Sequence, residues 1–273
     1  MGLQQAPKSK NNTAARETAR SLLSVFGRGV ATSRRVRARL SRPVSRDMPP
    51  VWTPRLTWIA FAAIYAMVVA AIFDPYFVPF SGPPHNFVLA FLRGITDVAK
   101  SGVYIVSAVI VVAIIGMLNW RDIRHATRRS LMTAYGQAAF ILVSVAGPGI
   151  LVNVIKQFVG RARPRIADEV GVYALAPFEF DHVYQGFPSG HAATAGSLAM
   201  ILMLWHPRAR WPAFGLLFLL ACARIPAGAH YPSDVIAGFS FAAILTLVLA
   251  RWLARRRAVF QFGDDSLFPV LKA

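Results

Sequence analysis

Long apolar stretches separated by polar segments dominate the chain from residue 56 onward. A helix of about 20 apolar residues crosses the hydrocarbon core of a bilayer. Six stretches approach that length, and we predict each as a membrane helix: Leu56–Phe77, Ser101–Asn119, Thr133–Ile155, Gly190–Trp205, Trp211–Ile225 and Val235–Trp252. No strands are expected. The pattern predicts an all-α, polytopic membrane protein with six transmembrane helices in a bundle.

Two further segments have amphipathic patterns that are typical of helices on a membrane surface. These are Ala15–Val30 near the N-terminus and Asn86–Lys100 between the first two apolar stretches. The rest of residues 1–50 is rich in arginine and poor in large apolar residues. We therefore predict a basic, mostly disordered cytoplasmic tail in 1–50, a membrane domain in 51–258 and a short C-terminal tail in 259–273.

Composition and charge support a membrane protein and argue against a nucleic-acid partner. Hydrophobic residues make up 55% of the 273 positions and charged residues only 15%, although the net charge is +18. Twelve lysines and arginines lie in residues 1–55, and most of the others flank apolar stretches. Basic residues in such places set membrane topology and contact anionic lipids. The expected partner is the lipid bilayer, and no nucleic acid.

The arginines also predict the orientation of the chain. The N-terminal tail, the loops after the second and fourth stretches and the C-terminal flank are basic, and all four fall on one side of the membrane. The positive-inside rule makes that side cytoplasmic, with both termini on it. The outer side then receives Lys156–Ser189 and Pro226–Ser233.

Three outer segments carry polar side chains to one membrane face. They are "KQFVGRARPR" from residue 156, "GFPSGHAATAGSLAM" from residue 186 and "ARIPAGAHYPSD" from residue 223. Their polar residues are Lys156, Arg161, Arg163, Arg165, Ser189, His191, Arg224, His230 and Asp234. Lysine and arginine donors, a serine hydroxyl and the N–H of Gly190 at a helix start suit a phosphate group.

The two histidines offer a nucleophile and a general acid at neutral pH. Asp234 follows His230 by four residues, so its carboxylate is placed to accept from the imidazole ring and fix the tautomer. Taken singly, the arginines also fit lipid-headgroup anchors, His191 a helix cap, and His230 with Asp234 a structural pair. A metal site needs a third ligand and would be opposed by the surrounding cations, so no metal is expected.

The joint pattern resembles the type-2 phosphatidic acid phosphatase family, which shares its site with the vanadium haloperoxidases and glucose-6-phosphatase. The motifs are Lys-x6-Arg-Pro from Lys156, Pro-Ser-Gly-His from Pro188, and Arg-x5-His-x3-Asp from Arg224. The resemblance covers roughly residues 55–255. One departure is Ala223, where the family usually has serine, and this change bears on how Arg224 is held.

The resemblance implies a role for each of these residues. His230 attacks phosphorus to form a phosphohistidine, Asp234 orients it, and His191 protonates the leaving group and then activates water. The phosphate-binding residues implied are Lys156, Arg163, Ser189, Gly190 and Arg224. Neither a metal ion nor another cofactor is implied.

The expected function is that of a metal-independent lipid phosphate or pyrophosphate phosphatase of the bacterial inner membrane, with its active site at the periplasmic membrane interface. Undecaprenyl pyrophosphate, phosphatidate, phosphatidylglycerol phosphate and lipid A are the candidate substrates. Two alternatives are a phosphotransferase using the same phosphohistidine, and a non-catalytic membrane protein that binds anionic lipid or transports a phosphorylated solute. No pattern in the sequence indicates an oligomeric state.

Overall fold

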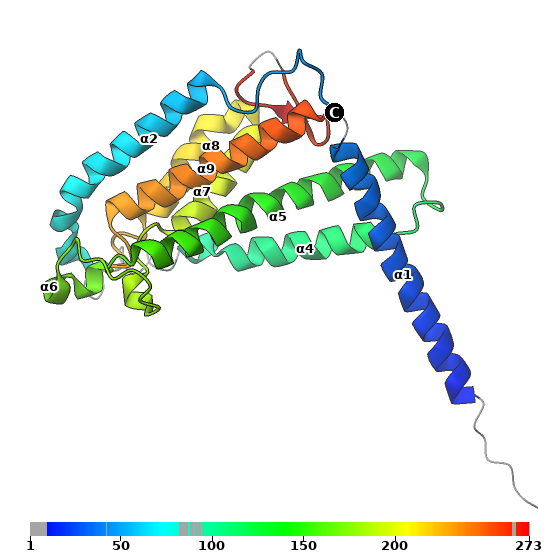
Figure 1. Ribbon diagram of the computed structural model, residues 1–273, viewed down its shortest axis with the longest axis horizontal. Coiled ribbons are helices and arrows are strands. Elements are labelled where there is room, and N and C mark those ends of the chain that lie inside the picture. Colours follow the sequence, from blue (N-terminus) through cyan, green and yellow to red (C-terminus); the bar gives the residue numbers. More distant parts are fainter. Residues whose placement is uncertain are drawn as a thin grey trace, which may run out of the picture.

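The described part of the protein is mostly helical, as the sequence predicts (Figure 1). A computed structural model describes residues 10–41, 43–81, 87, 90, 94, 96–263 and 266–272. The α-helices are α1 (Lys10–Leu40), α2 (Pro54–Phe73), α4 (Ser101–Met117), α5 (His125–Val159), α6 (Ala167–Val170), α7 (Gly190–Trp205), α8 (Arg210–Cys222) and α9 (Pro232–Arg255). Short 3-10 turns are η1 (Asp74–Ser81), η2 (Thr96–Ala99), η3 (Pro164–Ile166), η4 (His182–Tyr184) and η5 (Pro207–Ala209).

Each of the six predicted apolar stretches forms a helix. Among the described residues, three helical segments are long and apolar enough to cross a membrane: Pro54–Val78, His125–Val159 and Pro232–Arg255. Helices α4 and α7 are apolar but shorter, and α8 has only 13 residues. At 1.5 Å per residue α8 spans about 20 Å, which is less than the ~30 Å of a hydrocarbon core. A multi-pass membrane protein is therefore supported, whereas the count of six crossings stays a prediction.

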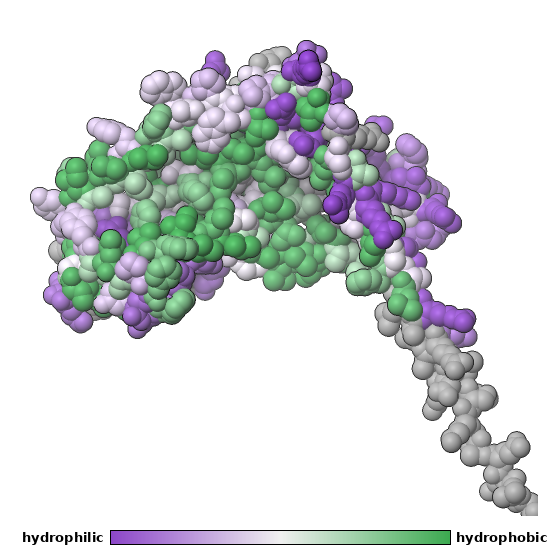
Figure 2. Space-filling model, in the orientation of Figure 1, coloured by the Kyte–Doolittle hydropathy of each residue, from purple (hydrophilic) through white to green (hydrophobic). Residues whose placement is uncertain are grey.

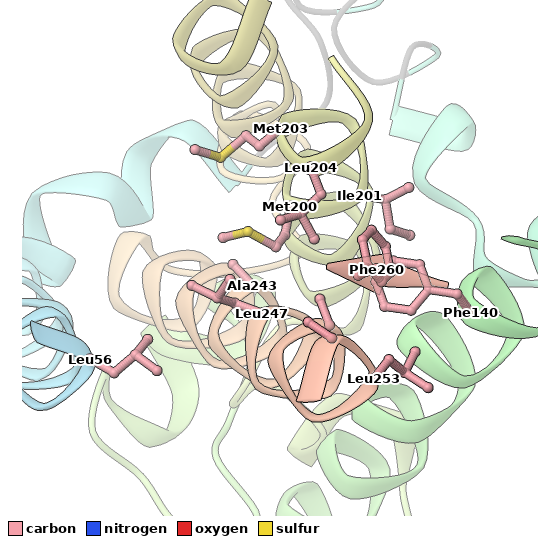
Figure 3. Packing of buried hydrophobic residues seen from close by; sticks show 12 residues of the cluster. Leu56, Phe140, Met200, Ile201, Met203, Leu204, Ala243, Leu247, Leu253 and Phe260 are labelled. Atoms are coloured by element: carbon pink, nitrogen blue, oxygen red, sulfur yellow. The ribbon is translucent and has the colours of Figure 1, made fainter. Parts of the chain in front are cut away.

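Helix α7 is the centre of the bundle and packs against α5, α8 and α9. Figure 3 shows the buried apolar cluster on one side of it, which includes Met200, Ile201, Met203, Leu204, Ala243, Leu247, Leu253, Leu56, Phe140 and Phe260. A Cβ on Gly196 would lie 2.1 Å from the Phe239 oxygen, so the backbones of α7 and α9 are in contact there. Close approach through small residues is how helices associate in lipid.

The outer surface of the bundle is suited to a bilayer. Figure 2 shows apolar side chains across the middle of the visible face, with polar side chains gathered toward its ends. Trp58, Tyr65 and Ile72 on α2 are each more than half exposed. Such a broad apolar surface is far larger than soluble monomers expose and marks contact with lipid.

The N-terminal tail differs from the prediction of a mostly disordered segment, because Lys10–Leu40 forms the single helix α1. Its alanines, leucines and arginines favour helix, and no proline interrupts it. The Thr32 hydroxyl donates to the Gly116 oxygen (3.0 Å), and Arg28 Nε donates to the Met117 oxygen (3.0 Å). These contacts join α1 to the end of α4. The predicted surface helix Ala15–Val30 lies within α1.

The structure bears on two other predictions, the surface helix Asn86–Lys100 and the absence of strands. The predicted surface helix Asn86–Lys100 lies mostly outside the described residues, and its described end is the 3-10 turn η2. The expectation of no strands is wrong at the C-terminus, where β1 (Phe260–Gln261) and β2 (Val270–Leu271) form an antiparallel pair. The buried Phe260 side chain, which packs edge-on against Phe140 at 4.7 Å, explains why the chain folds back on the bundle.

Candidate active site

The first motif lies where α5 ends. Gly160 terminates the helix in a left-handed conformation (φ 58°), and a Cβ there would collide with the Ala176 oxygen at 1.9 Å. Glycine is the residue that ends a helix in this way without strain. In the last turn of α5, the buried Lys156 donates from Nζ to the backbone oxygen of Gln185 at 3.0 Å. The ammonium group is thus held against the outer loop that leads to α7.

Arg163 is held against the same loop. Its Nε donates to the His182 oxygen at 3.0 Å, and its Nη2 lies 3.4 Å from the Gln185 oxygen. Burial lowers the pKa of Arg163 to about 10, with the neighbouring charges of Arg165 and Arg224 adding to the effect. Arg165 itself is exposed. A buried guanidinium among other cations, to which no carboxylate of the described residues is bonded, is a favourable place for an anion.

The second motif forms the start of α7. Ser189 is the N-cap and its hydroxyl accepts from the Ala192 N–H at 3.4 Å, so Gly190 and His191 are the first two helical residues. The first N–H groups of a helix have no partner within the helix and favour anions. The Ser189 N–H donates to the backbone carbonyl oxygen of Asp234 at 3.0 Å. This bond brings the second and third motifs together.

A glycine makes this junction possible. A Cβ on Gly238 in α9 would lie 2.2 Å from the Ser189 oxygen, so no larger residue fits without moving the two helices apart. The third motif begins after α8, where the Ala229 N–H donates to the Arg224 oxygen at 3.3 Å. The chain then enters α9 directly after His230.

His230 is buried, with 2% of its surface exposed, and its tautomer follows from one contact. Nδ1 lies 2.8 Å from the Gly186 oxygen. A carbonyl oxygen only accepts, so Nδ1 carries the proton and Nε2 carries the lone pair. Burial lowers the pKa of His230 to about 4, and the favourable contribution of the nearby Asp234 is smaller. The imidazole is therefore neutral at neutral pH, with Nε2 as its nucleophilic atom.

This geometry corrects one sequence expectation. Asp234 was expected to accept from the His230 ring, but its Oδ2 lies 3.7 Å from Nδ1, which is too far for a hydrogen bond. Oδ2 accepts instead from the Tyr231 N–H at 2.9 Å, and Oδ1 accepts from Arg161 Nη1 at 2.7 Å. The Gly186 oxygen sets the tautomer, and Asp234 supplies a negative charge beside the ring.

Sequence reasoning missed a residue that completes this arrangement. Asp74, fully buried at the end of α2, accepts from Arg161 Nη2 at 2.8 Å and from the Ser233 hydroxyl at 2.5 Å. The Arg161 guanidinium therefore bridges Asp74 and Asp234, and it also lies 4.4 Å from the centre of the Tyr231 ring. A signal was available, because an aspartate inside a predicted membrane stretch is unusual and is typically functional.

The structure thus brings all three motifs to one end of the bundle, at the junction of α5, α7 and α9. Among the described residues, no group of three or more histidine, cysteine, aspartate or glutamate side chains is placed to hold a metal ion. The arrangement combines the buried cations of Lys156 and Arg163, a helix N-terminus and a neutral imidazole with a defined nucleophilic nitrogen. This combination is suited to transferring a phosphoryl group.

Comparisons with known proteins agree with the motifs. Residues 137–258, which include every predicted site residue, match the family model of the PAP2 superfamily. Lipid A 1-phosphatase from Rhizobium johnstonii is 37% identical over 134 residues, covering 49% of this chain and 54% of that protein. Lipid A 1-phosphatase from Rhizobium etli is 35% identical over 134 residues, covering 49% and 57%. The chain spans about half the length of these curated relatives.

A solved structure is similar at lower identity. It is the crystal structure of a transmembrane PAP2 type phosphatidylglycerolphosphate phosphatase from Bacillus subtilis, with 19% identity and a TM-score of 0.43. The match covers 69% of this chain and 93% of that one. The resemblance predicted from the three motifs is confirmed by the family match.

Proposed function

We propose that this chain, whose residues 137–258 match the family model of the PAP2 superfamily, is a metal-independent phosphatase that hydrolyses the phosphate group of a membrane lipid through a phosphohistidine. The contact between His230 Nδ1 and the Gly186 oxygen is the observation that carries the proposal, because it leaves Nε2 as the nucleophile. The cations of Lys156 and Arg163 supply the anion-binding part of the site.

The first step forms a P–N bond and breaks a P–O bond. Nε2 of His230 attacks phosphorus, and the lipid oxygen leaves with a proton donated by His191. The imidazole gains positive charge as the bond forms, and the carboxylate of Asp234 at 3.7 Å stabilises that charge. The phosphate oxygens are held by Lys156, Arg163, Ser189, Gly190 and Arg224.

The second step returns the enzyme to its starting state. His191, now neutral, takes a proton from a water molecule as that water attacks phosphorus. The P–N bond breaks, His230 Nε2 regains its lone pair, and inorganic phosphate leaves. In this mechanism arginine, lysine and backbone N–H donors neutralise the charge on the transferred phosphoryl group, so no metal ion is required for that purpose. A phosphotransferase would differ only in using an alcohol in place of this water.

The first substrate to test is the 1-phosphate of lipid A. Two relatives with 37% and 35% identity over 134 residues carry the name lipid A 1-phosphatase, and this supports the choice. Undecaprenyl pyrophosphate, phosphatidate and phosphatidylglycerol phosphate are the comparison substrates, because the motifs recognise the phosphate and not the lipid.

Purified protein should release phosphate from at least one of these four lipids in detergent. The rate should be unchanged by EDTA, and vanadate should inhibit by mimicking the trigonal-bipyramidal transition state. No release from any lipid would contradict the proposed function, and loss in EDTA restored by magnesium would contradict its metal independence. Phosphate that appears only on an added alcohol would identify a phosphotransferase.

The site is proposed to face the periplasm from a bacterial inner membrane, with the arginine-rich loops and both termini in the cytoplasm. In a Cys222→Ser background, a cysteine at Asp168 should react with an impermeant thiol reagent on intact spheroplasts. A cysteine at Arg121 should react only after lysis. Both positions are exposed in the structure, so they are matched in accessibility. The reverse labelling pattern would contradict the proposed orientation.

A further inference from the structure

Asp74 lies outside the segment that matches the PAP2 superfamily, yet its side chain reaches the site. It ends α2, which packs along α9. Three donors point at its carboxylate: Arg161 Nη2 at 2.8 Å, the Ser233 hydroxyl at 2.5 Å and the Ser233 N–H at 3.1 Å. A buried carboxylate is costly unless it is paired and fully hydrogen-bonded, and Asp74 is both.

The partner of Asp74 is also the partner of Asp234. Arg161 Nη2 donates to Asp74, while Nη1 donates to Asp234 Oδ1 and to the Ser233 hydroxyl, both at 2.7 Å. A guanidinium has a planar fork that binds a single carboxylate with two parallel bonds when nothing else competes. Asp74 is the competing group, because it occupies one arm of the fork.

We propose that Asp74 is a positioning residue that holds Arg161 away from a two-armed pair with Asp234. This inference rests on the proposed phosphohistidine mechanism. With Asp74 in place, Asp234 gives Arg161 only Oδ1, and its Oδ2 stays on the Tyr231 N–H at 2.9 Å, facing His230. Without Asp74, Arg161 neutralises Asp234 and turns its carboxylate from the histidine. The charge that stabilises the phosphorylated imidazole is then lost.

Asp74 is also linked to the Asp234 carboxylate through Ser233. Both the N–H and the hydroxyl of Ser233 bond to Asp74, and Ser233 immediately precedes Asp234 in the first turn of α9. Asp74 therefore also fixes the backbone that carries Asp234. Through these contacts α2 helps to set the geometry of a site whose reacting groups all lie on later elements.

The test compares Asp74→Asn with wild type on a lipid phosphate that the wild type hydrolyses. Asparagine keeps the shape and removes the charge. We expect kcat to fall at least tenfold while KM changes less than threefold, because Asp74 bonds to Arg161 and Ser233 and not to the proposed phosphate-binding residues. Asp168→Asn removes an exposed carboxylate from the same end of the bundle and should leave kcat within twofold. An unchanged kcat in folded Asp74→Asn would overturn the proposal.

A coupling measurement separates positioning from a merely structural role. If Asp74 acts through Asp234, the fold-decrease in kcat caused by Asp234→Asn should be at least five times smaller in the Asp74→Asn background than in wild type. Losses that simply multiply would contradict the inference. If Asp74→Asn does not fold, Ser233→Ala, which removes the hydroxyl that bonds to Asp74, tests the proposal instead. We then expect kcat to fall at least threefold with KM unchanged, and an unchanged kcat would contradict the proposal. A wild type inactive on every lipid phosphate would contradict the proposed function instead.

Discussion

His230→Ala is expected to lower the rate of phosphate release at least a thousandfold. The substitution removes Nε2, the atom that the Gly186 contact leaves unprotonated and that the proposed mechanism makes the nucleophile. The loss should appear in kcat, since the phosphate-binding cations remain. A purified variant that retains a tenth or more of wild-type activity would move the nucleophile elsewhere.

The control for this variant is His230→Gln. Because His230 is buried, alanine leaves both a cavity and an unpaired Gly186 oxygen, and either could harm folding. The glutamine amide can donate to that oxygen but offers no nucleophile. It should therefore fold like wild type, as judged by a single size-exclusion peak in detergent, and be as inactive as the alanine variant.

Arg163→Ala is expected to lower kcat/KM at least a hundredfold, or about 2.7 kcal/mol of transition-state stabilisation. The change removes a buried cation that lies within the field of Arg224 and beside the loop of His182 and Gln185. Removing a single donor that stabilises the charge developing on the reacting group typically lowers the rate by about this factor. Steady-state kinetics on the same lipid phosphate measure the effect.

Arg165→Ala is the matched control. It removes the same charge two residues further along the chain, but its side chain is exposed and water screens it. We expect less than a threefold change in kcat/KM. Equal losses in the two variants would show that net positive charge at this face, and not a positioned donor, explains the requirement for Arg163.

The helices of the membrane domain could be predicted because apolar stretches of membrane length leave the backbone few alternatives. Their ends could not. Helix α5 begins at His125, eight residues before the predicted Thr133, because hydropathy marks the part in lipid and not the basic turns that continue the helix. Only the Ala15–Val30 part of helix α1 was predicted, because a lack of large apolar residues argues against a core, but not against a longer helix that docks through Thr32.

The site was predictable in its residue types and less so in its contacts. The three motifs and the family that they resemble brought His230, Asp234 and the phosphate-binding residues into one hypothesis, and the structure places these motifs at one junction. The Gly186 oxygen had no signature, since any residue has a carbonyl and only the fold aims it at His230. Asp74 had a signature, but its pairing with Arg161 depends on how α2 packs against α9.

The central claim is that His230 carries the phosphoryl group during turnover, and trapping that intermediate tests it most directly. Purified enzyme would be mixed with a lipid phosphate bearing radiolabelled phosphorus, quenched in alkaline denaturant and digested. The account predicts label on the peptide that contains His230, labile in acid as phosphohistidine is, and none in His230→Gln. Label on any other residue, or label of equal amount in His230→Gln, would contradict it.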